Sequence, residues 1–503
     1  MSNTTRIAKN TLALYFRQIL IMLVSLYTVR VVLNTLGAED YGIYNVVAGV
    51  VVLFSFVNNA MATSVQRFLN FYLGKNDVEK TRNVYSTSLV IHGIICLIFV
   101  VLAETVGLWF MNAKLNIPAG RSNATFWCYQ AAVITTLANI MRVPYNAVII
   151  AYEKMSFFAG LSIVEAVLKL AVVFLLKITL LDKLVFYSFL LAGVSFVILA
   201  IYKFYCNKNF EIAHYRINQD KGLGKELVSF SGWSLFGAVA NVANSQGTNI
   251  VLNIFTNVTV NAAMGIANQV NAAVYSFVSN FQTAFNPQIV KSYAAGEKEE
   301  FNQLIFRTSK FSFLLLWIIV LPLSLNLKTI LSLWLKNVPD YSICFVQLIL
   351  IYSLVDALNG PLWFAVQAQG KIRNYQIIVS ILIFLNLPLS IVAFILGGNP
   401  YSILIIRIAL GLIITCFRII YLKRNLGFDA RKFLLNAVLR CVLIAVLSFL
   451  LVRICTFKFS GILYFFVSCG LSILFCGLLS FFCGFTKNER NMVFSFVKVK
   501  MKK

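Results

Sequence analysis

The residues of this chain that could carry chemistry are charges embedded in long apolar stretches. Of its 503 residues, 60% are hydrophobic and only 12% are charged. An ionisable side chain at membrane depth is costly, so it faces a partner, a cavity or water. The embedded bases are Arg17, Arg30, Lys169 and Arg407, and the embedded acids are Glu165 and Asp356. These residues are the first candidates for a substrate or ion site.

Several of these charges also have a purely structural interpretation. Glu165 and Lys169 lie four positions apart, so they share one helical face and can form a local ion pair that lowers the cost of burying both. Arg30 and Arg407 stand near the ends of their stretches, where a long side chain can reach the interface. For these residues, packing or snorkelling is the alternative to a functional site.

Arg17 and Asp356 are harder to explain structurally. Arg17 lies about 8 Å from the end of its stretch at 1.5 Å per residue, which favours a role in a cavity. Asp356 stands near the middle of its stretch, with Asn359 one turn further on. Two interpretations of Asp356 remain open, either pairing with a buried base or serving as a proton or cation site.

A stripe of polar side chains marks the two consecutive stretches 227–254 and 260–286. Its members recur at helical spacing, which places them on one face of each helix. The candidates are Asn241, Asn244, Asn268, Asn271, Tyr275 and Gln282. Polar stripes also hold membrane helices together. Packing is therefore the alternative to a water-filled cavity, lined by amides and hydroxyls, that suits a sugar-like ligand.

Motifs typical of enzymes and metal sites are absent from the sequence. It has two histidines, no H-E-x-x-H motif and no Walker lysine motif. The ten cysteines include no C-x-x-C pair and lie mostly in apolar stretches, which indicates reduced, packed thiols. We therefore expect neither catalysis nor a cofactor or metal.

The elements that position these residues are membrane-spanning helices. Apolar runs of about 20 residues recur, and each can cross a ~30 Å hydrocarbon core as a helix. The sequence predicts an all-α polytopic membrane protein with about fourteen spans, near 11–35, 42–63, 84–108, 124–142, 156–177, 184–203, 227–254, 260–286, 309–331, 343–366, 374–396, 401–421, 433–455 and 460–483.

Charge placement predicts how the chain lies in the membrane. With an even number of spans both termini lie on one side, and Lys and Arg concentrate in the connectors of that side. The positive-inside rule then predicts cytoplasmic termini. This rule also explains the net charge of +25, so we do not expect a nucleic-acid partner.

The chain contains an internal repeat. Residues 41–88 align without gaps on 262–309, an offset of 221, and Pro144, Ala151 and Lys154 align on Pro361, Ala368 and Lys371 at an offset of 217. Each repeat holds six spans, so the two bundles should be related by a pseudo-two-fold axis along the membrane normal. The predicted domains are 1–222, 223–426 and a C-terminal helix pair with a basic tail, 427–503. The connector Arg67–Arg82 predicts an amphipathic helix at the cytoplasmic interface.

Three motifs carry a family resemblance. The turn Leu36-Gly37-x-x-x-Tyr41-Gly42-x-Tyr44, the pair Pro144-Tyr145-x-Ala147 and the segment Ala151-x-Glu153-Lys154-Met155 resemble polysaccharide-exporting members of the multidrug/oligosaccharidyl-lipid/polysaccharide (MOP) transporter superfamily. The layout of six, six and two spans is similar as well. Wzx-type flippases for O-antigen or capsule repeat units are the best match, over essentially the whole chain.

This resemblance implies a function in lipopolysaccharide or capsule synthesis at the bacterial inner membrane. The substrate would be an undecaprenyl-pyrophosphate-linked oligosaccharide, moved from the cytoplasmic to the periplasmic leaflet by alternating access. The pyrophosphate role falls on Arg17, and more weakly on Arg30 and Lys169. The amide-rich spans would meet the glycan, and H⁺ or Na⁺ coupling would involve Asp356 or Glu165. The expected partners are this lipid-linked glycan, membrane lipids and other polysaccharide-assembly proteins.

Two other functions are compatible with parts of the sequence. A MATE-like multidrug cation antiporter would require a net acidic cavity, whereas the embedded bases outnumber the acids here. A membrane glycan polymerase or ligase would be expected to have a large external loop, which the predicted spans do not leave room for. Because fold alone does not fix function, the charge balance and the resemblance decide in favour of the flippase.

Overall fold

The structure, a computed structural model, describes most of the chain. The described residues are 14–24, 27–28, 31–32, 35–36, 40, 43–44, 47, 55–109, 111, 120–176, 178–216, 221–256, 258–335, 338–486 and 489–490. Within these ranges the chain is almost entirely helical and forms no β-strand, which confirms the predicted all-α class.

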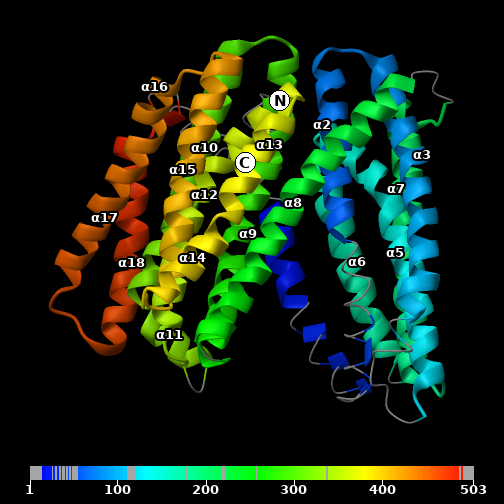
Figure 1. Ribbon diagram of the computed structural model, residues 1–503, viewed down its shortest axis with the longest axis horizontal. Helices are drawn as coiled ribbons and strands as arrows, with labels where there is room; N and C mark the ends of the chain where they lie inside the picture. The colour runs from blue at the N-terminus through cyan, green and yellow to red at the C-terminus, as the bar shows by residue number, and fades with distance from the viewer. Residues whose placement is uncertain are drawn as a thin grey trace, which may run out of the picture. The chain divides into compact units, whose positions relative to one another are not determined.

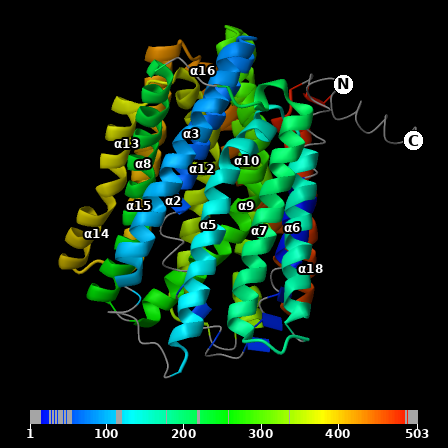
Figure 2. The same ribbon diagram turned by 90° about the vertical axis from the view of Figure 1, so that its right-hand side faces the viewer.

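The chain divides into two compact units, which we call the N-terminal unit (Lys9–Leu235) and the C-terminal unit (Phe236–Lys503). Beyond the short helix Leu14–Val24, the helices of the N-terminal unit are α2 (Ser55–Gly74), α3 (Val78–Leu102, continued by π-helical Ala103–Gly107), α5 (Ser122–Ala151), α6 (Met155–Leu175), α7 (Lys183–Asn209) and the start of α8 (Lys221–Phe255). In this unit α5 is central, packing on α2, α3 and α7, while α6 packs on α7 (Figure 1, Figure 2).

The C-terminal unit is built around α12. Its helices, after the end of α8, are α9 (Val258–Ala294), α10 (Lys298–Leu325), α11 (Leu327–Trp334), α12 (Ser342–Gln369), α13 (Arg373–Phe384), α14 (Asn386–Ile395), α15 (Ser402–Leu426), α16 (Ala430–Phe433), α17 (Arg440–Thr456) and α18 (Gly461–Leu479). Helix α12 packs on α9, α10 and α15. The division between the units falls inside α8, after Leu235, whereas the predicted boundary was the loop at 222, and the structure groups the C-terminal helix pair with the second unit.

The predicted spans correspond to helices throughout the described chain. Ten helices there are long and apolar enough to cross a membrane. The other predicted spans overlap Leu14–Val24, the start of α2 (residues 55–63), α8 and α9, and the last two carry the polar stripe. The predicted span 374–396 is divided at Leu385 into α13 and α14. Pro388, in the first turn of α14, has no N–H to continue the ladder of α13.

The predicted interfacial helix Arg67–Arg82 is wrong. Helix α2 runs on without a break to Gly74, and α3 begins only four residues later at Val78. Asn76 adopts a left-handed conformation at φ 55°, and the Asp77 carboxylate accepts a 2.9 Å hydrogen bond from the Lys80 N–H. The aromatic and basic residues of this connector therefore extend two long helices that meet in a tight turn.

The internal repeat appears directly in the backbone, with one change of register. The turn after α2 and the turn after α9 form the same hydrogen bonds, Asp77 N–H to the Tyr72 carbonyl and Glu297 N–H to the Ser292 carbonyl. These pairs lie 220 positions apart, so the ungapped offset of 221 is wrong by one residue at this turn. The offset of 221 aligns Tyr72 with the identical residue Tyr293. The backbone hydrogen bonds instead make Tyr72 equivalent to Ser292.

The second register of the repeat is matched by the backbone. Helices α5 and α12 contain Pro144 and Pro361 at equivalent places. After each helix the chain turns through a left-handed residue, Glu153 at φ 58° and Gly370 at φ 85°, again 217 positions apart. A side chain is strained in this conformation and glycine is not. The two turns therefore have the same backbone conformation, but only the second has glycine, the residue that this conformation favours.

Polar contacts fix the C-terminal hairpin, α17 and α18, to α10. Lys310 Nζ lies 2.6 Å from Glu489 Oε2 and donates to the Gly484 carbonyl at 2.9 Å. Further along α10, Trp317 Nε1 donates to Ser448 Oγ of α17 at 2.8 Å. The side chains of Lys310 and Glu489 are only 3% and 4% exposed, so this ion pair is buried. These contacts, with α17 and α18 side by side in Figure 1, make the hairpin part of the C-terminal unit.

Candidate functional site

A cluster of basic side chains in the N-terminal unit is the best candidate for a binding site. Glu165 of α6 bridges two bases: its Oε2 lies 2.8 Å from Arg142 Nη1 of α5, and its Oε1 lies 2.7 Å from Lys169 Nζ, one turn along α6. The predicted pair of Glu165 with Lys169 is therefore present. Arg142, inside α5, was not among the predicted site residues, and it completes the bridge.

Arg17 belongs to the same region of the N-terminal unit. Its guanidinium carbon lies 4.7 Å from the centroid of the Phe158 ring on α6, and Phe158 precedes Glu165 by seven residues, which places both on one helical face. Arg17 also interacts electrostatically with Tyr202 of α7, and the Arg142 guanidinium lies 5.9 Å from the Tyr202 ring. Buried Tyr202 thus has an arginine from each of two other segments as a neighbour.

The charge of this cluster is positive. Arg17, Arg142 and Lys169 contribute three positive charges, and Glu165, which forms ion pairs with Arg142 and Lys169, contributes one negative charge. The Lys169 side chain is 44% exposed and the Arg142 side chain 27% exposed, so both remain accessible from outside the protein. We call these four residues the basic cluster. Arg30, the other predicted pyrophosphate contact, lies outside the described residues.

In the C-terminal unit, Asp356 is the centre of a separate polar network. The Tyr275 hydroxyl of α9 donates to Asp356 Oδ2 of α12 at 2.7 Å. Arg418 of α15 interacts electrostatically with Asp356 and donates through Nε to the Tyr375 hydroxyl at 2.6 Å. Asp356 and Tyr275, predicted separately as an ion-coupling and a glycan residue, are therefore hydrogen-bonded to each other.

Arg407 and the remaining candidate amides of this unit differ in what they contact. The Arg407 guanidinium lies 4.3 Å from the centroid of the Tyr352 ring, so stacking on α12 accompanies its position near a helix end. Asn271 Oδ1 accepts from Ser353 Oγ at 2.5 Å, Asn268 is half-buried, and Asn241 is exposed. Asn268 and Asn241 thus remain candidates for contact with a ligand.

Two of the predicted cavity-lining amides are used for helix packing. Gln282 is 5% exposed, and its Nε2 donates to Ser312 Oγ of α10 at 3.1 Å and to the Ala357 carbonyl of α12 at 3.0 Å. A Cβ added at Gly360 would lie 2.2 Å from Gln282 Oε1, so the helices meet closely there. Asn244 is buried as well and accepts from Asn386 Nδ2 at 3.0 Å. Gln282 and Asn244 therefore hold helices together, which was the alternative to lining a cavity.

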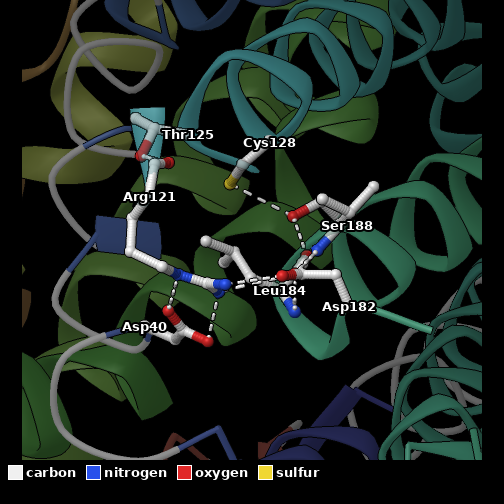
Figure 3. Close-up of polar contacts among 8 residues, drawn as sticks. Asp40, Arg121, Thr125, Cys128, Asp182, Leu184 and Ser188 are labelled. Atoms are coloured by element: carbon white, nitrogen blue, oxygen red, sulfur yellow. Dashed lines mark hydrogen bonds and ion pairs between the residues drawn. The ribbon is translucent and has the colours of Figure 1, made fainter. Parts of the chain in front are cut away.

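A second charged network joins three connectors of the N-terminal unit at one end (Figure 3). Arg121 donates to both oxygens of Asp40, through Nε at 2.8 Å and Nη2 at 2.5 Å, and its Nη1 lies 2.5 Å from Asp182 Oδ2. Asp182 also caps α7, accepting from the N–H groups of Leu184 and Val185. Because Asp40 and Asp182 contact it from two other segments, Arg121 stabilises the unit and is not a candidate for binding an anion.

The network should make stability depend on acidic pH. Burial opposes ionisation of Asp182, but the Arg121 guanidinium and the α7 N–H groups outweigh it and hold the pKa of this carboxyl below its usual range. A carboxyl with a lowered pKa contributes stability above its unfolded pKa and loses it as the pH falls through the folded value, here below about pH 4. Asp182→Asn keeps the cap and should cost about 1 kcal/mol at neutral pH. Thermal unfolding in detergent from pH 7 to 3 would measure this, and identical pH profiles for variant and wild type would contradict it.

Comparisons with known families cover most of the chain. The family described as polysaccharide biosynthesis protein matches residues 7–294, more than half of the sequence. The MatE family matches residues 248–392. Among curated proteins, no sequence matches the chain significantly.

Solved transporter structures share the fold. An outward-facing multidrug resistance MATE family transporter of the MOP superfamily superposes with a TM-score of 0.71 at 11% identity, covering 83% of this chain and 96% of its own. A mutant of the Vibrio cholerae MATE transporter VcmN gives 0.68 at 17% identity, covering 84% and 97%. A MOP superfamily transporter from Pyrococcus furiosus, whose reverse pocket polarity is said to suggest a different function, gives 0.68 at 11% identity, covering 82% and 96%.

These findings define the class of protein. The fold and the helices that can cross a membrane are those of a multi-pass transporter of the MOP superfamily. Within this superfamily, the chain belongs to the polysaccharide biosynthesis protein family.

Proposed function

We propose that this protein is a lipid-linked oligosaccharide flippase of the bacterial inner membrane, with both termini in the cytoplasm. It moves undecaprenyl-pyrophosphate-linked repeat units from the cytoplasmic to the periplasmic leaflet by alternating access. The observation that carries the proposal is the net positive basic cluster of the N-terminal unit, with three bases and one acid. Membership of the polysaccharide biosynthesis family supports the class of substrate.

The cluster suits the charged part of such a substrate. Carrying a pyrophosphate through hydrocarbon without protein is prohibitively costly, and fixed cations offset the loss of hydration. Arginine offers a planar fork of donors that matches phosphate oxygens, and lysine adds a mobile point charge. In this proposal Arg17, Arg142 and Lys169 bind the pyrophosphate, while Asn241 and Asn268 meet the glycan.

An ion gradient provides the driving force in the same proposal. Asp356 is the stronger candidate for H⁺ or Na⁺ coupling, because it accepts a hydrogen bond from the Tyr275 hydroxyl and, among the described residues, forms no direct ion pair, although Arg418 interacts with it electrostatically. Glu165, the other candidate, has both oxygens occupied by bases. A carboxylate already neutralised by two cations has less to gain from a proton or a sodium ion.

A MATE-like multidrug antiporter is the second candidate, favoured by the match of residues 248–392 to the MatE family and by the shared fold. Its cationic drugs would be repelled by the basic cluster. The two functions therefore predict opposite preferences for the charge of the substrate.

The test is the sidedness of lipid-linked oligosaccharide in cells depleted of this protein. We expect accumulation in the cytoplasmic leaflet, cured by the wild-type gene but not by Arg17→Ala, because the variant lacks one of three cations for the pyrophosphate. Accumulation that both genes cure would retain the flippase and remove Arg17 from the path. Normal export together with heightened sensitivity to cationic dyes would reject the flippase in favour of the antiporter.

A further inference from the structure

The basic cluster already contains an anion of its own. Glu165 uses each carboxylate oxygen for a different base, Oε2 for Arg142 of α5 and Oε1 for Lys169 of α6, at 2.8 and 2.7 Å. Both distances are those of charge-assisted hydrogen bonds. The carboxylate therefore occupies donors of the two bases that an incoming phosphate would use.

The bridge is placed where a ligand can replace it. The Glu165 side chain is 19% exposed and those of its two partners are more so, in contrast to the Lys310–Glu489 pair, which is almost completely buried. Lys169 is joined to Glu165 along one helix, so its flexible side chain can turn away without moving the backbone. The bridge is therefore not sealed inside the protein, and an incoming anion can replace the carboxylate at the same donors.

The charges favour such an exchange. One carboxylate leaves the cluster with a surplus of positive charge, whereas a pyrophosphate brings more negative charge and more acceptor oxygens to the same donors. Phosphate oxygens also accept bidentate contacts from arginine as carboxylate oxygens do. A diphosphate can therefore take over the Arg142 and Lys169 contacts and add Arg17.

We infer that Glu165 is a resident anion: it holds Arg142 and Lys169 while the site is empty, and the diphosphate of the substrate displaces it. This inference rests on the proposed function and adds that Glu165 sets the affinity of the site for the diphosphate. When the substrate leaves, the carboxylate recovers the two bases, which assists release. Without this competitor the site would bind its ligand more tightly and let it go more slowly.

Binding of inorganic pyrophosphate and of undecaprenyl pyrophosphate to the purified full-length protein tests the inference. If the carboxylate is displaced in about one-tenth of the empty molecules, Glu165→Gln should bind either probe about tenfold more tightly. Glu165→Asp retains the competing charge and should show no such gain. Glu211→Gln is the matched control, because Glu211 forms a 2.7 Å ion pair with Arg82 in the same unit, away from the cluster.

The outcomes separate this inference from the proposed function. Wild type that binds the probes, with Glu165→Gln equal or weaker, overturns the resident anion and leaves the flippase intact. Absence of binding in wild type and in Glu165→Gln, each shown to be folded by size-exclusion chromatography, overturns both. An equal gain in Glu211→Gln would reveal a general effect of removing negative charge and would also reject the specific role of Glu165.

Discussion

Replacing Lys310 by methionine should lower the thermal unfolding temperature of the purified protein more than replacing Asp182, Arg142 or Lys432. The substitution leaves the Glu489 carboxylate, 4% exposed, without the ammonium group 2.6 Å away. Arg307, at 3.8 Å from the other oxygen, replaces it only in part. Breaking a buried ion pair from one side typically costs about 3–5 kcal/mol, because the remaining charge stays buried without compensation.

The double variant Lys310→Met with Glu489→Leu provides the decisive comparison. It removes both charges together, so we expect it to recover most of the lost stability. Lys432→Met is the matched control, since Lys432 pairs with Asp429 at 3.1 Å with a side chain 70% exposed and should change stability by less than about 1 kcal/mol. A double variant less stable than Lys310→Met would show that the pair itself holds the hairpin in place.

Replacing Arg142 by glutamine should reduce flipping by at least about tenfold, since loss of a charged contact to a substrate commonly costs more than 1.4 kcal/mol. The variant removes the base that joins α5 to the basic cluster and lowers the charge available to a pyrophosphate. Glu165 keeps its contact with Lys169, so the helix pair should remain folded. The rate of appearance of lipid-linked oligosaccharide in the periplasmic leaflet measures the effect.

Arg82→Gln controls for the loss of a positive charge in the same unit. Arg82 pairs with Glu211, which is 79% exposed, and among the described residues neither forms an ion pair with the basic cluster. Flipping by this variant should stay close to wild type. Equal rates for Arg142→Gln and wild type would contradict a role of Arg142 in the substrate path.

Periodicity predicted the fold well because each span carries its own signal. A run of about 20 apolar residues is recognisable without knowledge of its neighbours. The misplaced interfacial helix at Arg67–Arg82 shows the limit of this approach. Its aromatic and basic residues fit an interfacial helix as well as the ends of two long helices. The left-handed turn at Asn76, which joins α2 to α3, depends on local hydrogen bonds that composition does not show.

The sites were harder to predict because they depend on contacts between distant residues. The spacing of Glu165 and Lys169 predicted their pairing within one helix, but nothing in the sequence connects Arg142 with Glu165, 23 positions away. Arg121 and its two aspartates are separated by even more of the chain. Gln282 and Asn268 share one polar stripe, and only tertiary packing distinguishes the buried amide from the half-buried one.

The left-handed residues Glu153 and Gly370 show where the two halves of the chain carry different charges. They fix the alignment of α5 with α12, so Arg142 occupies the place of Asn359, and Asn139 the place of Asp356. Within one turn of helix, then, the first copy combines an amide with a base and the second combines an acid with an amide. Two positions on an otherwise shared backbone thus give equivalent stretches of α5 and α12 charges of opposite sign.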